Sequence, residues 1–222
     1  MFQIFFYRYF LIVSLVLLYG CSSKDDPVFA KPKQVLPIEV LYKTAYQNFT
    51  NNNYRNAIKL FEEVEKNYSY NTEWASKALL MRGYIYYESS RYIESLEILK
   101  KFKVRYAGNK NIDYVEYLIA MCIFEQIEPV AMTQENTLLA DRQFKKIIAN
   151  YPTSKYAEDS NFKLDLIQDQ LAGKEMYIAK YYTKREKWGP ALMRLNKIVK
   201  QYETTVYIEE ALHRLVEIHY KL

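Results

Sequence analysis

Small, large and aromatic side chains recur along this chain at offsets that place them on one face of a helix. Four tyrosines mark the copies: Tyr68, Tyr106, Tyr151 and Tyr202. Eleven residues before each tyrosine stands a small residue: Ala57, Ser95, Ala140 and Ala191. Seven residues before each stands a large apolar one: Phe61, Leu99, Phe144 and Leu195. Four residues before each stands another: Val64, Phe102, Ile147 and Ile198. Steps of three and four residues form a single helical stripe, so the pattern predicts four amphipathic helices in one register.

A second small residue lies twelve positions before the first in three of the copies: Ala45, Gly83 and Ala179. Two small residues on antiparallel helices allow close backbone approach, which predicts helical hairpins. Gly83-x-x-Tyr86, Ala57-x-x-x-Phe61 and the proline at Pro152 resemble the tetratricopeptide repeat. The resemblance implies an all-α solenoid of about four full repeats plus the start of a fifth.

The spacing between the marker tyrosines is uneven, at 38, 45 and 51 residues. We interpret the second interval as an insertion near Glu128–Thr137, and the third as one long helix, or two joined at Gly173, over residues 156–186. A fifth copy begins at Ile208 and the sequence stops at Leu222. We therefore expect a partner or further chain to cover the last apolar face, because a solenoid needs a closing element.

The N-terminus carries an export signal. An apolar run, Phe10–Leu18, is too short to span a bilayer and ends in Leu18-Tyr19-Gly20-Cys21, which resembles the lipobox of bacterial lipoproteins. The resemblance implies that residues 1–20 are a cleaved signal peptide and that Cys21 is acylated; an ordinary signal peptide or a short anchor helix is the alternative. Ser22 after the cysteine favours the outer membrane by the same resemblance. Residues 21–37 are expected to be a flexible tether and residues 38–222 the repeat domain.

Charge and side-chain chemistry argue against catalysis. The net charge of +5 becomes +4 without Arg8, the one charged residue in positions 1–20, and such a mild excess requires no nucleic-acid partner. Cys122 lies in an apolar run and is expected to be a buried, inert thiol. His213 and His219 are six residues apart, which does not suit a metal pair. We expect no enzyme activity, no metal and no cofactor apart from the covalent acyl lipid on Cys21.

Several segments in this order resemble the BamD family, the lipoprotein subunits of the machinery that folds β-barrels into the outer membrane. The segments are Asn111–Tyr117, Tyr151–Tyr156, Asp169–Arg185 and the residues Trp188 and Arg194. The resemblance implies that the N-terminal repeats receive unfolded barrel precursors and that the C-terminal repeats dock a BamA-type barrel subunit, with accessory lipoproteins as further partners. Another lipid-anchored repeat scaffold for cell-wall or secretion machinery is the alternative function.

The same resemblance gives candidate partner-binding residues. Asp113 and Tyr114 would lie in or near the precursor-binding half, and Arg185 and Arg194 in the BamA-binding half. Each has a structural alternative: Asp113 as a helix cap, Tyr114 as packing between repeats, Arg185 at a helix C-terminus and Arg194 on a solvated face. We expect Arg185 to end one helix and Arg194 to lie just inside the next, on either side of a turn at Trp188–Pro190.

Overall fold

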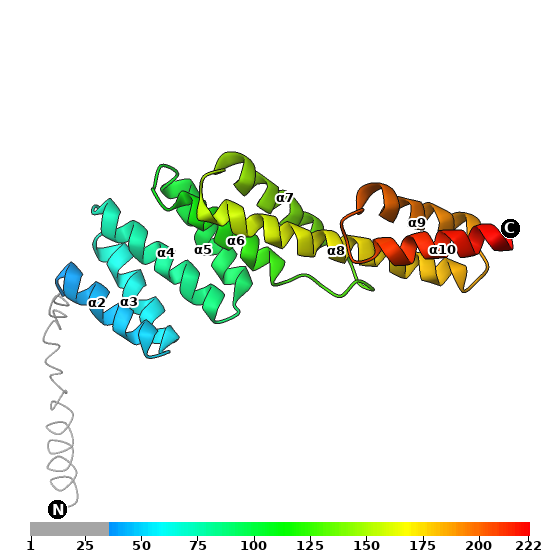
Figure 1. The fold of residues 1–222 in the computed structure, drawn as a ribbon. Helices are drawn as coiled ribbons and strands as arrows, with labels where there is room; N and C mark the ends of the chain where they lie inside the picture. Colours follow the sequence, from blue (N-terminus) through cyan, green and yellow to red (C-terminus); the bar gives the residue numbers. More distant parts are fainter. Residues whose placement is uncertain (1–35) are drawn as a thin grey trace, which may run out of the picture. The chain divides into compact units, whose positions relative to one another are not determined.

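The computed structural model describes residues 36–222, which are helical throughout apart from the connections (Figure 1). The helices are α2 (Ile38–Thr50), α3 (Tyr54–Asn67), α4 (Thr72–Glu88), α5 (Tyr92–Arg105), α6 (Ile112–Phe124), α7 (Glu135–Asn150), α8 (Lys155–Thr183), α9 (Trp188–Gln201) and α10 (Ile208–Lys221). The predicted signal peptide, the acylated Cys21 and most of the predicted tether lie outside these residues.

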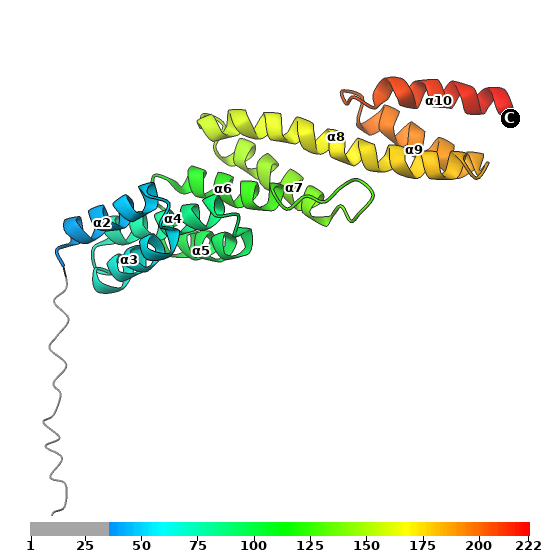
Figure 2. The same cartoon turned by 90° about the horizontal axis from the view of Figure 1, so that it is seen from below.

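Each helix packs mainly on its neighbours in sequence, forming four hairpins followed by α10 against α9. The hairpins are α2–α3, α4–α5, α6–α7 and α8–α9, as Figures 1 and 2 show. No strand occurs among residues 36–222. The prediction of an all-α solenoid with four repeats and the start of a fifth is confirmed.

The small and large positions of the repeat register form the core of these hairpins. Ala45 of α2 and Ala57 of α3 are 0% exposed, and so are their counterparts Ala179 and Ala191 in the fourth hairpin. The large residue four positions after the second small one is also fully buried in every copy: Phe61, Leu99, Phe144 and Leu195. Small side chains bring the helices together and large ones fill the space between successive hairpins.

The marker tyrosines are the residues at which the second helix of each hairpin ends. In Tyr68, Tyr106, Tyr151 and Tyr202 the backbone N–H still donates to the carbonyl four residues earlier. Pro152 directly follows one of them and cannot continue a helix. The stripe therefore predicts where the helices stop as well as which side they bury.

Three of the four hairpins turn through a residue with left-handed backbone. Asn52, Ser90 and Glu186 have φ near 58° and are not glycine. The connection between α8 and α9 differs from our expectation of a turn at Trp188–Pro190. Helix α9 already begins at Trp188, so these residues form the first turn of the helix, and residues 184–187 make the connection. Proline is tolerated there because the first N–H groups of a helix have no intrahelical partner.

In the remaining hairpin the insertion forms the loop from residue 125 to 134, slightly earlier than predicted because α7 already begins at Glu135. This loop reaches along α8. Gln170 Nε2 donates to the Glu128 carbonyl at 2.7 Å, and Lys174 Nζ donates to the Met132 carbonyl at 2.9 Å.

Helix α8 is one continuous helix of 29 residues. Its first half packs Ile167 against Phe144 of α7, and its second half packs Met176 against Leu195 of α9. Figure 2 shows α8 running from α7 to α9. The helix passes through Gly173 without a break. Glycine suits this position because an added Cβ would lie 2.9 Å from the Tyr207 hydroxyl.

Candidate partner-binding site

Aromatic side chains form a row across the first helices of successive hairpins, which we call the aromatic row. Phe49 of α2 contacts Tyr84 of α4, with ring centroids 5.8 Å apart. Tyr114 and Tyr117 of α6 contact Tyr156 of α8 at 5.1 and 5.0 Å. Edge and offset ring contacts of this kind stabilise packing, and the five rings remain partly exposed.

Tyr84 and Tyr114 of the row stay neutral at physiological pH. A hydrogen bond with Glu88, together with burial, raises the pKa of Tyr84 to about 12. Burial raises the pKa of Tyr114 well above its ordinary value. Tyr114, a candidate contact for barrel precursors, is half-buried between hairpins, so its packing role is established in this structure.

Asp113 joins the starts of two helices. One oxygen of its carboxylate accepts a 2.7 Å hydrogen bond from the hydroxyl of Ser154, and the other accepts one from the backbone N–H of Tyr114 at 2.8 Å. Ser154 is itself the N-cap of α8 and accepts from the N–H of Tyr156. Asp113 thus fixes α6 against α8, whereas the N-cap position of α6 is Asn111.

Arg185 is exposed in the turn after α8. Its guanidinium carbon lies 3.7 Å from the ring centroid of Tyr181, which is 48% exposed. Stacking of a guanidinium on an aromatic ring leaves the N–H donors at its edges available. Arg185 and Tyr181 therefore form a surface suited to an acidic partner.

Arg194 lies near the middle of α9 rather than just inside it, and it contacts α8. Its Nη1 donates to Glu175 at 2.9 Å, and Lys197 Nζ donates to the other oxygen of the same carboxylate at 2.5 Å. The Glu175 side chain is 8% exposed and that of Arg194 is 40% exposed. Arg194 and Arg185 therefore have separate contacts, and Arg194 combines a structural ion pair with a partly exposed guanidinium.

Buried glutamates of this kind are the site residues that sequence reasoning missed. Glu116 of α6 is paired with Lys103 of α5 and with Gln143 of α7, and Glu65 of α3 is paired with three cations. The position of Glu116 and Glu175 within the repeat pattern is a signal that could have revealed both from the sequence. Four residues before the small position of the first helix stand Leu41, Leu79, Glu116 and Glu175. A carboxylate at a core position indicates a buried ion pair, because an unpaired charge there is costly.

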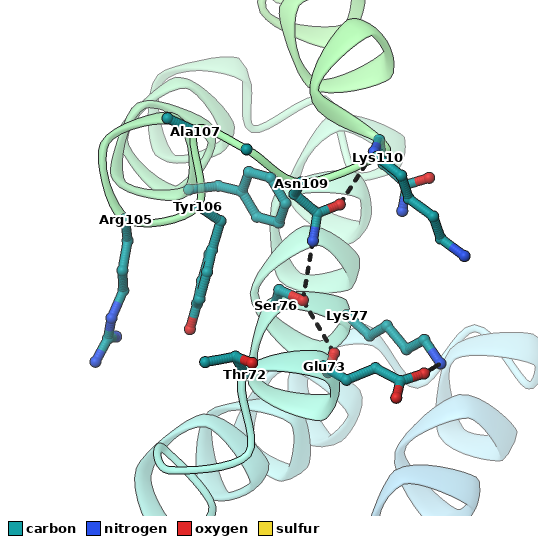
Figure 3. Close-up of a pocket in the computed structure, with 12 residues that line it drawn as sticks. Thr72, Glu73, Ser76, Lys77, Arg105, Tyr106, Ala107, Asn109 and Lys110 are labelled. Carbon is teal, nitrogen blue, oxygen red and sulfur yellow. Dashed lines mark hydrogen bonds and ion pairs between the residues drawn. The ribbon is translucent and has the colours of Figure 1, made fainter.

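A polar hollow of about 550 Å³ lies at the end of the second hairpin, between the start of α4 and the α5–α6 connection (Figure 3). Asn109 Nδ2 donates to the hydroxyl of Ser76 at 3.3 Å, and this hydroxyl donates to the Glu73 carbonyl at 3.0 Å. Arg105 and Tyr106 extend along the opposite wall. The hollow offers hydrogen-bonding groups of both kinds, which suits a polar peptide segment rather than an apolar ligand.

Among the described residues, Cys122 is a free cysteine and is buried. No group of three or more histidine, cysteine or acidic side chains able to hold a metal occurs in residues 36–222. Cys122 is buried, as predicted, and its thiol donates to the Ser95 hydroxyl at 3.2 Å; burial raises the pKa of the thiol to about 11, which disfavours the reactive thiolate. Within the same residues, no helix is long and apolar enough to cross a membrane.

These features define a class of protein: an all-α helical-repeat scaffold. Residues 36–222 match the YfiO family, described as outer membrane lipoprotein. The outer membrane protein assembly factor BamD of Caulobacter vibrioides is 36% identical over 203 residues, covering 90% of this chain and 65% of that protein. The BamD proteins of Rickettsia prowazekii and Neisseria gonorrhoeae are 34% and 29% identical, with 82% and 77% of their lengths covered.

The chain belongs to the YfiO family of outer membrane lipoproteins. It spans slightly less than two thirds of the length of the Caulobacter relative, at 65%. Family membership confirms the predicted family, the outer-membrane location and the non-enzymatic character of the protein.

Proposed function

We propose that this chain is an assembly factor for outer-membrane β-barrel proteins, held at the membrane by acyl chains on Cys21. The observation that carries the proposal is the family match over residues 36–222, because it includes every helix of the described domain. The relatives are each named as an outer membrane protein assembly factor, which supports the same function here. More than one acyl chain is needed for firm anchoring, since a single chain binds only marginally.

The two halves of the domain have different tasks in this proposal. The first hairpins receive unfolded barrel precursors on the aromatic row, with Asp113 and Tyr114 fixing its far end by joining α6 to α8. An extended segment with aromatic side chains suits such a surface, since alternate side chains can enter pockets between rings. The C-terminal hairpins bind a BamA-type subunit through Arg185 and Arg194, and accessory lipoproteins complete the complex.

Co-purification from outer-membrane fractions tests the proposed function. A large β-barrel protein should co-purify with the wild-type chain. The variant Cys21→Ala should be released from the membrane pellet while keeping its helicity, so the barrel protein should no longer be recovered with it from the membrane fraction. Crosslinking with a peptide from the C-terminus of a barrel protein should label residues before about Tyr117. Recovery of cell-wall or secretion proteins without a β-barrel protein would favour a different scaffold function.

Charge reversal separates the two proposed arginine contacts. Arg185→Glu should weaken binding of the BamA-type subunit without changing stability, because Arg185 contacts only an exposed ring among the described residues. Arg194→Glu would also place a second acid beside Glu175, so Arg194→Gln is the appropriate companion variant. Unchanged binding in Arg185→Glu and Arg194→Gln, with folding intact, would remove both residues from the interface.

A further inference from the structure

A second, smaller hollow lies beside the one in Figure 3 and has an unusual charge pattern. Its volume is about 270 Å³, and Arg105 lines both hollows. We call it the Arg82 hollow. Four cations and two carboxylates line it: Lys66, Arg82, Lys101, Arg105, Glu62 and Glu65. They come from α3, α4 and α5, so the hollow lies at the junction of the first two hairpins.

Arg82 is the buried centre of this hollow and uses few of its donors. Its side chain is 9% exposed. Nη1 donates to Glu65 at 2.7 Å, whereas Nη2 lies 3.6 Å from Glu62, beyond hydrogen-bonding distance. The Nε–H group is buried and has no acceptor. Guanidinium groups present five N–H donors, and a buried donor without an acceptor is rare in folded proteins.

The two oxygens of Glu65 accept from three cations, and neither accepts from the Nε–H group of Arg82. One oxygen accepts from Lys101 at 2.6 Å and from Arg105 at 3.0 Å, and the other accepts from Arg82. Lys101 and Arg105 remain 49% and 45% exposed. With four cations against two carboxylates the hollow has an excess of two positive charges. Glu65 thus pairs with three of the cations that line the hollow, while the Nε–H group of Arg82 stays without an acceptor.

We propose that the Arg82 hollow binds the carboxylate of an acidic side chain in an extended segment of a partner protein. A guanidinium fork matches the two oxygens of a carboxylate, and fixed cations bind it with less loss of side-chain entropy. The peptide that carries this acidic side chain continues into the larger polar hollow, since Arg105 lines both hollows. Glu62, whose side chain is 60% exposed, stands where the incoming carboxylate docks and moves aside for it.

This site is independent of the aromatic row and of Arg185 and Arg194, so it can be tested alone. The probe is a capped peptide with adjacent glutamates between glycines and serines, added to the ¹⁵N-labelled full chain in detergent micelles. Titration should shift the Arg82 Nε–H resonance in a saturable way. A peptide with glutamine in place of glutamate should leave that resonance unmoved. An equal shift with the glutamine peptide, or with inorganic phosphate at the same concentration, would overturn the proposal.

Substitutions at half-exposed positions avoid unfolding the chain. Lys101→Gln with Arg105→Gln should weaken peptide binding by about tenfold or more, because two charge-assisted contacts are lost. Lys100→Gln, at an exposed neighbour on α5, is the matched control and should have no effect. Glu62→Gln should instead tighten binding by about twofold to fivefold, the range of one exposed charge pair. If the cluster had a purely structural role, Glu62→Gln would not tighten peptide binding. An unchanged Kd for the glutamate peptide in Glu62→Gln would therefore refute the site, and so would peptide binding that survives the double substitution.

Discussion

Arg194 Nη1 lies 2.9 Å from Glu175 Oε2, so an arginine proposed for partner binding is also bound to a buried carboxylate of its own chain. Lys197 neutralises the same carboxylate from one turn further along α9. In the first two hairpins the position of Glu175 is held by Leu41 and Leu79, which are both buried. The fourth hairpin thus replaces an apolar contact by an ion cluster that holds cations at the surface of α9.

The cluster predicts a strongly non-additive pair of substitutions. Arg194→Ala alone should lower the free energy of unfolding by about 1 kcal/mol, because Lys197 still neutralises Glu175. Arg194→Ala combined with Lys197→Ala should cost about 3 kcal/mol or more, since it leaves a buried carboxylate without a cation. Denaturant melts of the two single variants and the double variant give the coupling. Additive losses would show that Glu175 is more solvated than its 8% exposure indicates.

The same carboxylate predicts a loss of stability in acid. Burial pushes the pKa of Glu175 upward, but hydrogen bonds from Lys197 and Arg194 outweigh burial and place the pKa below its ordinary value of 4.5. A lowered pKa in the folded state means that the stabilisation is fully present above about 4.5 and is lost as the pH falls through the folded pKa. Glu175→Gln should therefore flatten the dependence of unfolding free energy on pH below about 4.5, the unfolded-state value. An unaltered slope in this variant would assign the acid sensitivity to other carboxylates.

A glycine in the repeat register should tolerate no side chain. At Gly83 an added Cβ would lie 2.7 Å from Cδ2 of Leu99, which is fully buried. Gly83→Ala should therefore destabilise the chain by about 1–3 kcal/mol through overpacking between α4 and α5. Gly108 has no atom within 4 Å of its added Cβ, so Gly108→Ala is the matched control and should be close to neutral. Equal thermal midpoints for the two variants would count against the close helix contact.

The sequence predicted the periodic part of this fold because burial follows helical spacing. The buried positions Ala57, Phe61 and Val64 were predicted correctly, and an insertion does precede α7, although its loop lies slightly earlier than predicted. The pairing of Arg194 with Glu175 could not be read from the chain, since their contact depends on how α8 and α9 face each other. The two hollows were also missed. The α5–α6 connection forms much of the larger one, and side chains of three different helices meet in the Arg82 hollow, so neither has a periodic signal along the chain. The one indication in the sequence was that Glu116 and Glu175 occupy repeat positions that are leucine in the first two hairpins, which points to buried ion pairs.

The left-handed turn residues give a prediction that depends on backbone conformation alone. Ser90 and Glu186 have φ of 57° and 58°, a region that costs residues with a Cβ about 1 kcal/mol. Ser90→Gly and Glu186→Gly should each raise the free energy of unfolding by about 0.5 kcal/mol, because relief of strain exceeds the added flexibility of the unfolded chain. Asn52 also has a positive φ of 58°, but asparagine tolerates this region, so Asn52→Gly should gain less and serves as the internal comparison. Denaturant melts of the three variants measure the order directly. A larger gain at Asn52 than at Glu186 would contradict the strain argument.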